Sequence, residues 1–284
     1  MMKPLKTLLL AAMPLAGGAQ EATSPELFTY KVGAYEVILL PESQGQGNTS
    51  ILIGATPKMI RQAIPDGTYP NAVNAFLVKT PEGNVLIDTG FGRQLTKNLA
   101  TADITPDDIQ MLIITHAHGD HIGGMLTGDD QPAFPKARLV TSAVEKRYWV
   151  DEKKQVQAVR AFHAYSDRAE LIQPEELDRQ RGDGIFFIDA PGHTPGHIAC
   201  LLRSEGEQLL VWGDLTHAMA IQMPYPEVSV TYDTDPMQAA KTRLQILRFV
   251  AQHRIPVAGM HVAYPGMGYV KEVKEDSFRF EPLR

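Results

Sequence analysis

The sequence predicts a single domain of mixed α/β class. Short apolar runs bounded by glycine, proline and asparagine indicate strands, and other stretches between them indicate helices. These elements fall into two similar halves of strands and helices along the chain. A chain of 284 residues with 44% hydrophobic content can bury a large core as one domain.

The expected elements follow in chain order. In the first half we expect strands at Tyr35–Leu40, Val73–Lys79, Val85–Ile87 and Met111–Ile114, and helices at Lys58–Ala63 and Ser142–Trp149. In the second half we expect strands at Ile185–Ile188, Ile198–Arg203, Gln208–Trp212 and Pro256–Gly259, and a helix at Asp235–His253. Turn-forming residues separate most of these segments.

The N-terminus has the pattern of a bacterial secretory signal peptide. A basic start is followed by a short apolar segment and small residues that end at Ala19. The apolar segment is shorter than the roughly 20 residues that a membrane-spanning helix needs. We therefore expect cleavage near Ala19, a mature domain of residues 20–284, and a periplasmic or secreted protein. The alternative is a disordered cytoplasmic tail.

Charge and cysteine content exclude several functions. The net charge is -6 and there is no long basic run, so the composition gives no reason to expect nucleic acid as a partner. A lone cysteine, Cys200, excludes an intramolecular disulfide and a thiolate-rich metal cluster. It lies in a strand-like run, where a buried, inert thiol is expected.

The segment Thr115–His121 carries four potential metal ligands in six residues. His116 and His118 are two apart, so their side chains fall on the same side of an extended segment and can reach one metal ion. We expect the chain to turn into a helix at 119–124, which would direct Asp120 and His121 toward a second ion. Imidazoles combined with a carboxylate suit zinc, manganese or iron.

Four ligands are too few for two ions, so the pattern predicts further ligands downstream. His193 follows an apolar run and lies within glycine-proline turns. Asp214 closes the apolar run that begins at Gln208, and His261 follows the one that begins at Ile255. Each candidate ligand thus lies where an expected strand gives way to a loop.

These residues resemble the metallo-beta-lactamase superfamily, whose signature is H-x-H-x-D-H followed by a histidine, a bridging acid and a last histidine. The resemblance implies a four-layer αββα sandwich that holds two divalent metal ions, with zinc as the first choice. It assigns the ligands in three groups: His116, His118 and His193 to one ion, Asp120, His121 and His261 to the other, and Asp214 as the bridge. Asp88 resembles the family's early aspartate, which braces the metal loops.

Within the superfamily the chain resembles the methyl parathion hydrolase branch and its lactonase relatives. The resemblance rests on the segments 71–78, 213–222 and 261–269. One departure is Tyr264, where that branch often has phenylalanine. Asp214 stands where some class B beta-lactamases have a cysteine ligand, which argues against that class. The resemblance also implies a homodimer.

The resemblance implies a hydrolase that attacks its substrate with a hydroxide shared by the two ions. The expected substrates are lactones or other esters, with phosphotriesters as a side activity. Asp120 would shuttle a proton to the leaving group. His217 stands where related lactonases have a tyrosine that donates to the substrate carbonyl oxygen, and either that role or a loop hydrogen bond suits it. The alternatives are a beta-lactamase, a thioesterase or a non-catalytic metal- or ligand-binding protein.

Specificity in such sites comes from loops, and here we expect the loops 45–69 and 219–232 above the metals. Their neighbourhood offers four large side chains that suit either a pocket or an ordinary core or surface contact: Tyr69, Trp149, Met223 and Tyr225. The remaining histidines have simpler expected roles. His197 is expected to support the ligands, and His163 and His253 to lie on the surface of helices.

Overall fold

The computed structural model describes residues 27–179 and 184–284. The expected signal peptide and its cleavage point near Ala19 lie outside the described residues. Within those ranges, no helix is both long enough and apolar enough to cross a membrane.

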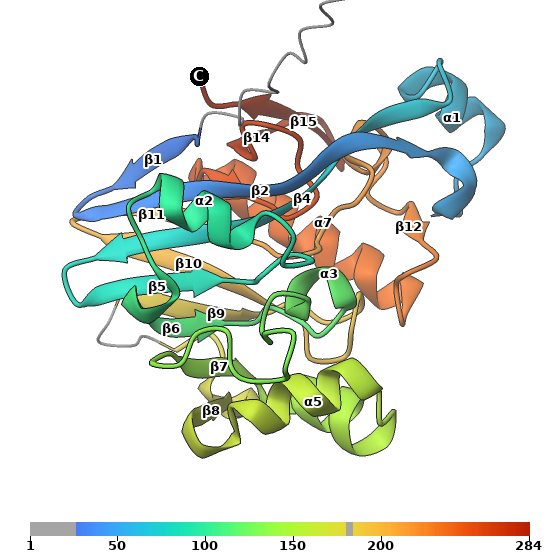
Figure 1. Cartoon of the computed structure of the whole chain (residues 1–284). Coiled ribbons are helices and arrows are strands. Elements are labelled where there is room, and N and C mark those ends of the chain that lie inside the picture. The colour runs from blue at the N-terminus through green and yellow to red at the C-terminus, as the bar shows by residue number, and fades with distance from the viewer. Residues whose placement is uncertain (1–26, 180–183) are drawn as a thin grey trace, which may run out of the picture.

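Two sheets pack face to face, with helices on both outer sides (Figure 1). One sheet has the order β1-β2-β4-β5-β6-β7-β8, with bounds Thr29–Val32, Tyr35–Asn48, Thr68–Thr80, Gly83–Ile87, Ile109–Ile113, Arg138–Ser142 and Ala169–Ile172. The other has the order β15-β14-β13-β11-β10-β9, with bounds Ser277–Pro282, Met267–Lys274, Val257–Ala258, Glu207–Val211, Ile198–Ser204 and Ile185–Asp189. A short pair joins β3 (Leu52–Ile53) to β12 (Ser229–Val230).

The α-helices are α1 Pro57–Ala63, α2 Leu95–Thr101, α3 Gly119–Ile122, α4 Ala143–Lys146, α5 Val156–Ala164, α6 Met219–Gln222 and α7 Pro236–His253. Helices α2 and α5 cover the outer face of the first sheet and α7 covers that of the second, whereas α1 lies beside the extended ends of β2 and β4 (Figure 1). A π-helical turn, η3 (Arg147–Glu152), continues α4. The short 3-10 turns are η1 Thr49–Ile51, η2 Pro106–Asp108, η4 Ser166–Arg168 and η5 Pro174–Glu176.

The layers follow from the two-residue period of the strands. In β10, Cys200 and Leu202 face the core between the sheets, whereas Ala199 and Leu201 face the core under α7. The first sheet divides its side chains in the same way between the inter-sheet core and a core under α2 and α5. The result is the four-layer αββα sandwich, and Cys200 is buried as expected.

Most expected elements are present, but several bounds differ. The strand expected at Tyr35–Leu40 runs on to Asn48, because its polar second half pairs with the start of β4 as a two-stranded extension. The segment expected as the loop 45–69 is therefore partly strand. The edge hairpin β14–β15 and the strands β7 and β8 were not predicted, since they are short or rich in charged residues.

Candidate metal centre

The candidate ligands stand where strands end, as the sequence predicted. The strands β5, β6 and β7 are parallel, so the residues after their carboxyl ends lie at one edge of the sheet. His116 and His118 follow β6, and Asp120 and His121 begin α3. From the second sheet, ligand candidates follow three strands, β9, β11 and β13: His193, Asp214 and His261.

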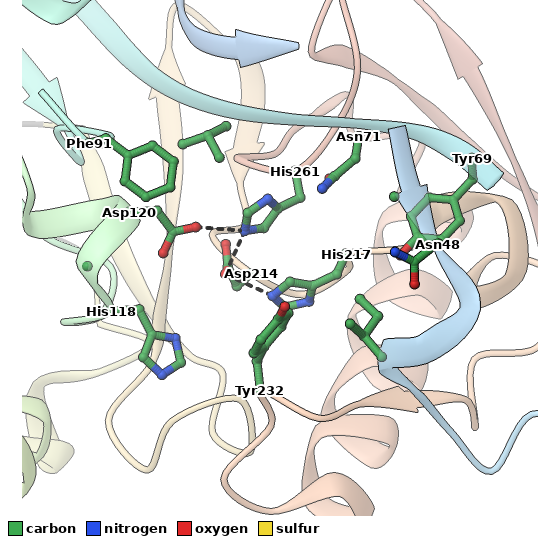
Figure 2. A pocket seen from close by; sticks show the side chains of 14 residues that line it. Asn48, Tyr69, Asn71, Phe91, His118, Asp120, Asp214, His217, Tyr232 and His261 are labelled. Atoms are coloured by element: carbon green, nitrogen blue, oxygen red, sulfur yellow. Dashed lines mark hydrogen bonds and ion pairs between the residues drawn. The ribbon is translucent and has the colours of Figure 1, made fainter. Parts of the chain in front are cut away.

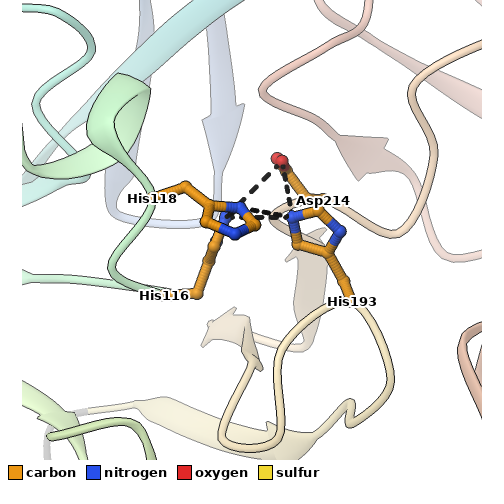
Figure 3. Close-up of side chains that lie close together, drawn as sticks. All are labelled: His116, His118, His193 and Asp214. Carbon is orange, nitrogen blue, oxygen red and sulfur yellow. Dashed lines mark hydrogen bonds and ion pairs between the residues drawn. The ribbon is translucent and has the colours of Figure 1, made fainter. Parts of the chain in front are cut away.

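We call His116, His118 and His193 the three-histidine cluster. Their ring nitrogens converge, with His118 Nδ1 2.9 Å from His193 Nε2 and His116 Nε2 3.1 Å from each of the other two (Figure 3). In a tetrahedral zinc site with Zn–N of about 2.0–2.1 Å, the distances between ligand nitrogens are roughly 3.3 Å. The cluster is therefore close to the geometry that one zinc-like ion needs.

We call Asp120, His121 and His261 the mixed cluster. His261 Nε2 lies 3.5 Å from Asp120 Oδ2, and His121 Nε2 lies 3.8 Å from Asp120 Oδ1. The ligand atoms of the three residues all lie within 4.8 Å of one another, which is compatible with a second ion. His121 is fully buried, whereas the Asp120 side chain is 23% exposed.

Asp214 lies between the two clusters. Its Oδ2 is 3.3 Å from His193 Nε2 and 3.0 Å from His261 Nε2, and its Oδ1 is 3.2 Å from His121 Nε2. The carboxylate is therefore placed to serve as a ligand on both sides. Although Asp214 Oδ1 and His121 Nε2 lie this close together, both atoms are buried and neither makes a hydrogen bond to a described residue.

The hydrogen bonds of the outer ring nitrogens support metal binding. His121 Nδ1 is 2.7 Å from Asp88 Oδ2, His193 Nδ1 is 2.9 Å from Asp233 Oδ1, and His261 Nδ1 donates to the carbonyl oxygen of Ala72. Each acceptor fixes the proton on Nδ1, so the lone pair of Nε2 in the neutral ring faces the centre. Converging lone pairs beside a carboxylate are suited to a cation.

The pKa shifts agree with this view. Burial and the neighbouring His193 lower the pKa of His118 to about 3. Burial also acts to lower the pKa of His193, but hydrogen bonds to Asp214 and Asp233 overcome it and raise that pKa to about 9. Positive charge is therefore favoured beside Asp214, and divalent ions would supply it.

His197 supports Asp214, and both of its ring nitrogens make hydrogen bonds to the main chain. Its Nδ1 donates to the carbonyl oxygen of Ala190, and its Nε2 accepts from the main-chain N–H of Asp214. Gly213 has a φ of 59°, and a Cβ at this position would lie 2.2 Å from His197 Nε2. Only glycine allows this approach without strain. The supporting role that the sequence suggested is consistent with these contacts.

A cavity of about 480 Å³ opens above the clusters (Figure 2). Its floor includes His118, Asp120, Asp214, His217 and His261, and its walls include Gly47, Asn48, Ile51, Tyr69, Asn71, Val73, Phe91 and Tyr232. Both segments expected above the metals, 45–69 and 219–232, contribute to the lining. Of the four large side chains suggested for the pocket, Tyr69 lines this cavity, and Trp149, Met223 and Tyr225 do not.

His217 lies on the floor of this cavity beside the mixed cluster. Its Nε2 is 3.0 Å from Asp214 Oδ2, and its ring stacks on that of His261 with centroids 4.6 Å apart. Its Nδ1 has no hydrogen-bond partner among the described residues. Burial lowers the pKa of His217 to about 4, so the ring is neutral near pH 7 and carries one N–H.

Two acidic residues at the site were not identified from the sequence. Asp233 holds His193 and accepts from the main-chain N–H of Val230. Glu145 lies on α4, is fully buried and reaches the loops of the three-histidine cluster. Neither belongs to a motif with metal-ligand spacing, so only the folded arrangement identifies them.

Comparison with known proteins agrees with this geometry. The family model described as the metallo-beta-lactamase superfamily matches residues 68–253. The chain is 28% identical over 182 residues to the acyl-coenzyme A thioesterase MBLAC2 of Bos taurus, covering 56% of the chain and 64% of that protein. It is 27% identical over 220 residues to an atrochrysone carboxyl ACP thioesterase of Aspergillus chevalieri, covering 68% and 63%. The chain thus spans less than two thirds of the length of these curated relatives.

A solved structure is similar over almost the whole domain. It is AidC, a dizinc quorum-quenching lactonase in complex with the product N-hexanoyl-L-homoserine. The TM-score is 0.83 at 26% identity, and the match covers 91% of this chain and 97% of that one. The fold and the arrangement of its layers are therefore shared with a metal-dependent hydrolase.

Proposed function

The chain belongs to the metallo-beta-lactamase superfamily, and we propose that it is a metal-dependent hydrolase that cleaves a lactone or another carboxylic ester. The observation that carries the proposal is the position of Asp214, between two ligand clusters and on the floor of a cavity. The likeness to AidC at 26% identity supports the lactonase branch.

In this proposal the three-histidine cluster and the mixed cluster would each hold one divalent ion, with zinc as the first choice, and Asp214 would be a ligand of both. Two such ions would supply a hydroxide nucleophile at neutral pH and would polarise the scissile carbonyl. No serine or cysteine nucleophile is then required. The single cysteine, Cys200, is buried in the core, and burial raises the pKa of its thiol well above its usual value.

Asp120 is the proposed proton carrier. Burial acts to raise its pKa, but the neighbouring His121 and His261 lower it below its usual value. The carboxylate is therefore ionised at neutral pH and can accept a proton from the attacking water. Because it lines the cavity and is partly exposed, it can pass that proton to the leaving alkoxide.

His217 is the proposed hydrogen-bond donor to the oxygen of the scissile carbonyl. It is neutral near pH 7 and lines the cavity. Its one N–H lies on Nε2 and faces Asp214 Oδ2 at 3.0 Å, and divalent ions that take up the charge of Asp214 would leave this N–H free for the substrate oxygen. Replacing His217 with phenylalanine should lower kcat by roughly 10²–10³-fold, the usual effect of losing one such donor. The metal content of the variant should equal that of the wild type if His217 only donates a hydrogen bond to the substrate. It should fall if His217 is a metal ligand.

The cavity walls suit a substrate that is apolar with one further polar group. Ile51, Val73 and Phe91 supply apolar surface. Asn48 and Asn71 also line it and add polar surface. An amide or hydroxyl beyond the scissile ester would suit such a wall.

A thioesterase is the second candidate, because both curated relatives named above carry that activity in their names, at 28% and 27% identity. The chemistry of the metal centre serves either ester. Phosphotriester hydrolysis is proposed only as a side activity of the same hydroxide. In all cases the partner is a small molecule.

The test is elemental analysis of the purified protein, with turnover of a lactone, an aryl ester, a thioester, a phosphotriester and a beta-lactam measured on the same sample. We expect two ions per chain and the highest kcat/KM for the lactone or the aryl ester. Preference for the thioester would instead favour the second candidate. A fully loaded protein that turns over none of them would overturn the hydrolase proposal and favour a binding protein.

We also propose that the enzyme acts in the periplasm or outside the cell, on the strength of the N-terminal sequence pattern alone. Expression of the full chain in a bacterial host, followed by fractionation and N-terminal sequencing, tests this. A mature N-terminus near residue 20 in the periplasmic fraction is the expected result. An intact N-terminus in the cytoplasm contradicts it.

A further inference from the structure

Glu145 is a buried residue whose carboxylate accepts four hydrogen bonds. One donor lies in η3, the segment that continues α4, and the other three lie on loops outside it. Its side chain lies on α4, apart from both clusters and from the cavity lining. Oε1 accepts from the main-chain N–H of Ala117 at 2.9 Å and from Trp149 Nε1 at 2.6 Å. Oε2 accepts from Thr194 Oγ1 at 2.7 Å and from the main-chain N–H of Gly196 at 3.1 Å.

Three of these donors belong to the two loops that carry the three-histidine cluster, and Trp149 lies in η3. Ala117 stands between His116 and His118, and Thr194 directly follows His193. One carboxylate therefore joins two loops that come from different sheets. In the part of the chain that the structure describes, neither Asp214 nor the mixed cluster hydrogen-bonds to this carboxylate.

The packing around Glu145 requires this arrangement. A Cβ at Gly196 would meet the main-chain nitrogen of Glu145 at 2.2 Å, so the His193 loop lies directly against α4. On the other side, the indole that donates to Glu145 also packs edge-on against His118, with ring centroids 5.2 Å apart. The loops and the helix thus meet around the carboxylate with little free space.

We propose that Glu145 is the positioning residue of the three-histidine cluster. Its carboxylate holds the His116–His118 loop and the His193 loop in the one arrangement in which their ring nitrogens converge on an ion. The inference rests on the proposed function in one respect, namely that this cluster binds a metal ion. It adds that one of the two ions depends on Glu145 and the other does not.

A carboxylate suits this position because it is an acceptor at both oxygens. Glutamine has almost the same shape, but its NH2 group must face the donors of one loop or of the other. The main-chain N–H of that loop then loses its acceptor and faces another N–H group, which is unfavourable. We expect Glu145→Gln to weaken the three-histidine cluster for metal by roughly 10–100-fold, the range for losing a partner that orients a ligand.

The experiment is a Co²⁺ titration of the metal-free full chain against a competing chelator, followed by absorption spectroscopy. Glu42→Gln is the matched control, since Glu42 is also buried and accepts two main-chain N–H groups, from Arg93 and Gln94, but contacts neither histidine loop. His193→Ala and His261→Ala serve as references with one cluster damaged each. Wild type and Glu42→Gln should bind two ions tightly.

Glu145→Gln should bind one ion tightly and one weakly, and its one-equivalent spectrum should match that of His193→Ala and differ from that of His261→Ala. Two tight ions, or equal weakening of both, would overturn the inference while leaving the hydrolase proposal intact. A wild-type chain that binds fewer than two ions would overturn both. If Glu145→Gln does not fold, Thr194→Val removes one of the four donors and should weaken the same ion about fivefold.

Discussion

The two ligand clusters share Asp214 but differ in ligands and in support. The three-histidine cluster offers three nitrogens and is supported by Glu145 and Asp233. The mixed cluster offers two nitrogens and a carboxylate, and Asp88 supports it. Its own carboxylate, Asp120, is partly exposed to the cavity, so in the proposed enzyme this cluster would combine metal binding with access to the substrate.

The difference teaches that each cluster can be weakened separately. Asp88 accepts from His121 Nδ1 and from the main-chain N–H and hydroxyl of Thr115, and it reaches His116 only through that hydroxyl. Within the described residues, Glu145 and Asp233 hydrogen-bond to the loops or rings of the three-histidine cluster and not to those of the mixed cluster. Substitutions at these acids should therefore distinguish the two ions, whereas a change at the shared carboxylate should affect both.

Asp214→Ala has the largest expected effect. It removes the ligand that both clusters share and leaves the surrounding ring nitrogens without their central negative charge. Affinity for both ions should fall by more than about 100-fold, beyond the usual effect of losing a supporting residue, and turnover should be lost. Elemental analysis and ester hydrolysis measure the two outcomes.

The matched control is Asp235→Asn. Asp235 caps α7 by accepting from the main-chain N–H of Gln238, and asparagine caps a helix equally well. This variant should keep both ions and full activity. An Asp214→Ala protein that still holds two ions would show that the clusters do not depend on a shared ligand, and the comparison would lose its basis.

Asp88→Asn has the next largest expected effect, and it should act mainly on the mixed cluster. Asp88 has a φ of 56°, a conformation that asparagine tolerates, so the backbone is not strained. The amide cannot accept all three hydrogen bonds, and the unmade one costs about 1–3 kcal/mol of folding stability. Affinity for the ion of the mixed cluster should fall roughly 10–100-fold.

Urea unfolding and the Co²⁺ titration check this prediction together. The one-equivalent spectrum of Asp88→Asn should match that of His261→Ala, the opposite of the expectation for Glu145→Gln. Selective loss of the other ion would mean that the link through Thr115 to His116 dominates, and Asp88 would then belong to the three-histidine side.

Asp233→Asn should have a smaller effect on the three-histidine cluster. The amide carbonyl can still accept from Val230, but its NH2 group then faces His193 Nδ1. This favours the tautomer with the proton on Nε2, where it blocks the lone pair that faces the ion. We expect about a tenfold loss of affinity. Nitrogen NMR of His193 in the metal-free protein would show the change if recorded above the His193 pKa of about 9, where the wild-type ring is also neutral. An unaltered tautomer would contradict the explanation.

The contrast between the acids also shows what the sequence could and could not predict. Asp88 was identified because it ends a buried strand within a stretch that resembles a family motif. Glu145 follows Ser142 by three residues, which is the pattern of a helix capping box. A local interpretation would direct its side chain to the backbone of Ser142, yet the folded chain directs it to two loops that are distant in sequence.

The fold shows the same limit. Strands with a clear apolar pattern, such as β9 and β10, were predicted within a residue or two. Strand β14, which is second from the edge of its sheet, carries lysine and glutamate in its exposed second half and gave no clear signal. The polar half of β2 became strand only because β4 pairs with it. Long-range pairing decides such segments, and a single sequence does not record it.

The smallest expected effect is at the cavity walls, where Phe91 and Tyr232 lie on opposite sides of the centre (Figure 2). Phe91 is beside Asp120, and Tyr232 has its ring centroid 6.0 Å from that of His217, the proposed donor to the carbonyl. An acyl chain that leaves a carbonyl held by His217 should pass along Tyr232. Tyr232→Ala should therefore raise KM for a long-chain lactone about fivefold, with kcat unchanged, because ground state and transition state lose the same contact.

Phe91→Ala is the matched change on the side of the mixed cluster and should alter KM less than about twofold. Neither variant should affect a short-chain lactone, since its acyl group ends before either wall. A larger KM effect at Phe91 would reverse the orientation of the substrate. The acyl chain would then lie over Asp120, and the leaving group, not the acyl group, would lie on the side of His217.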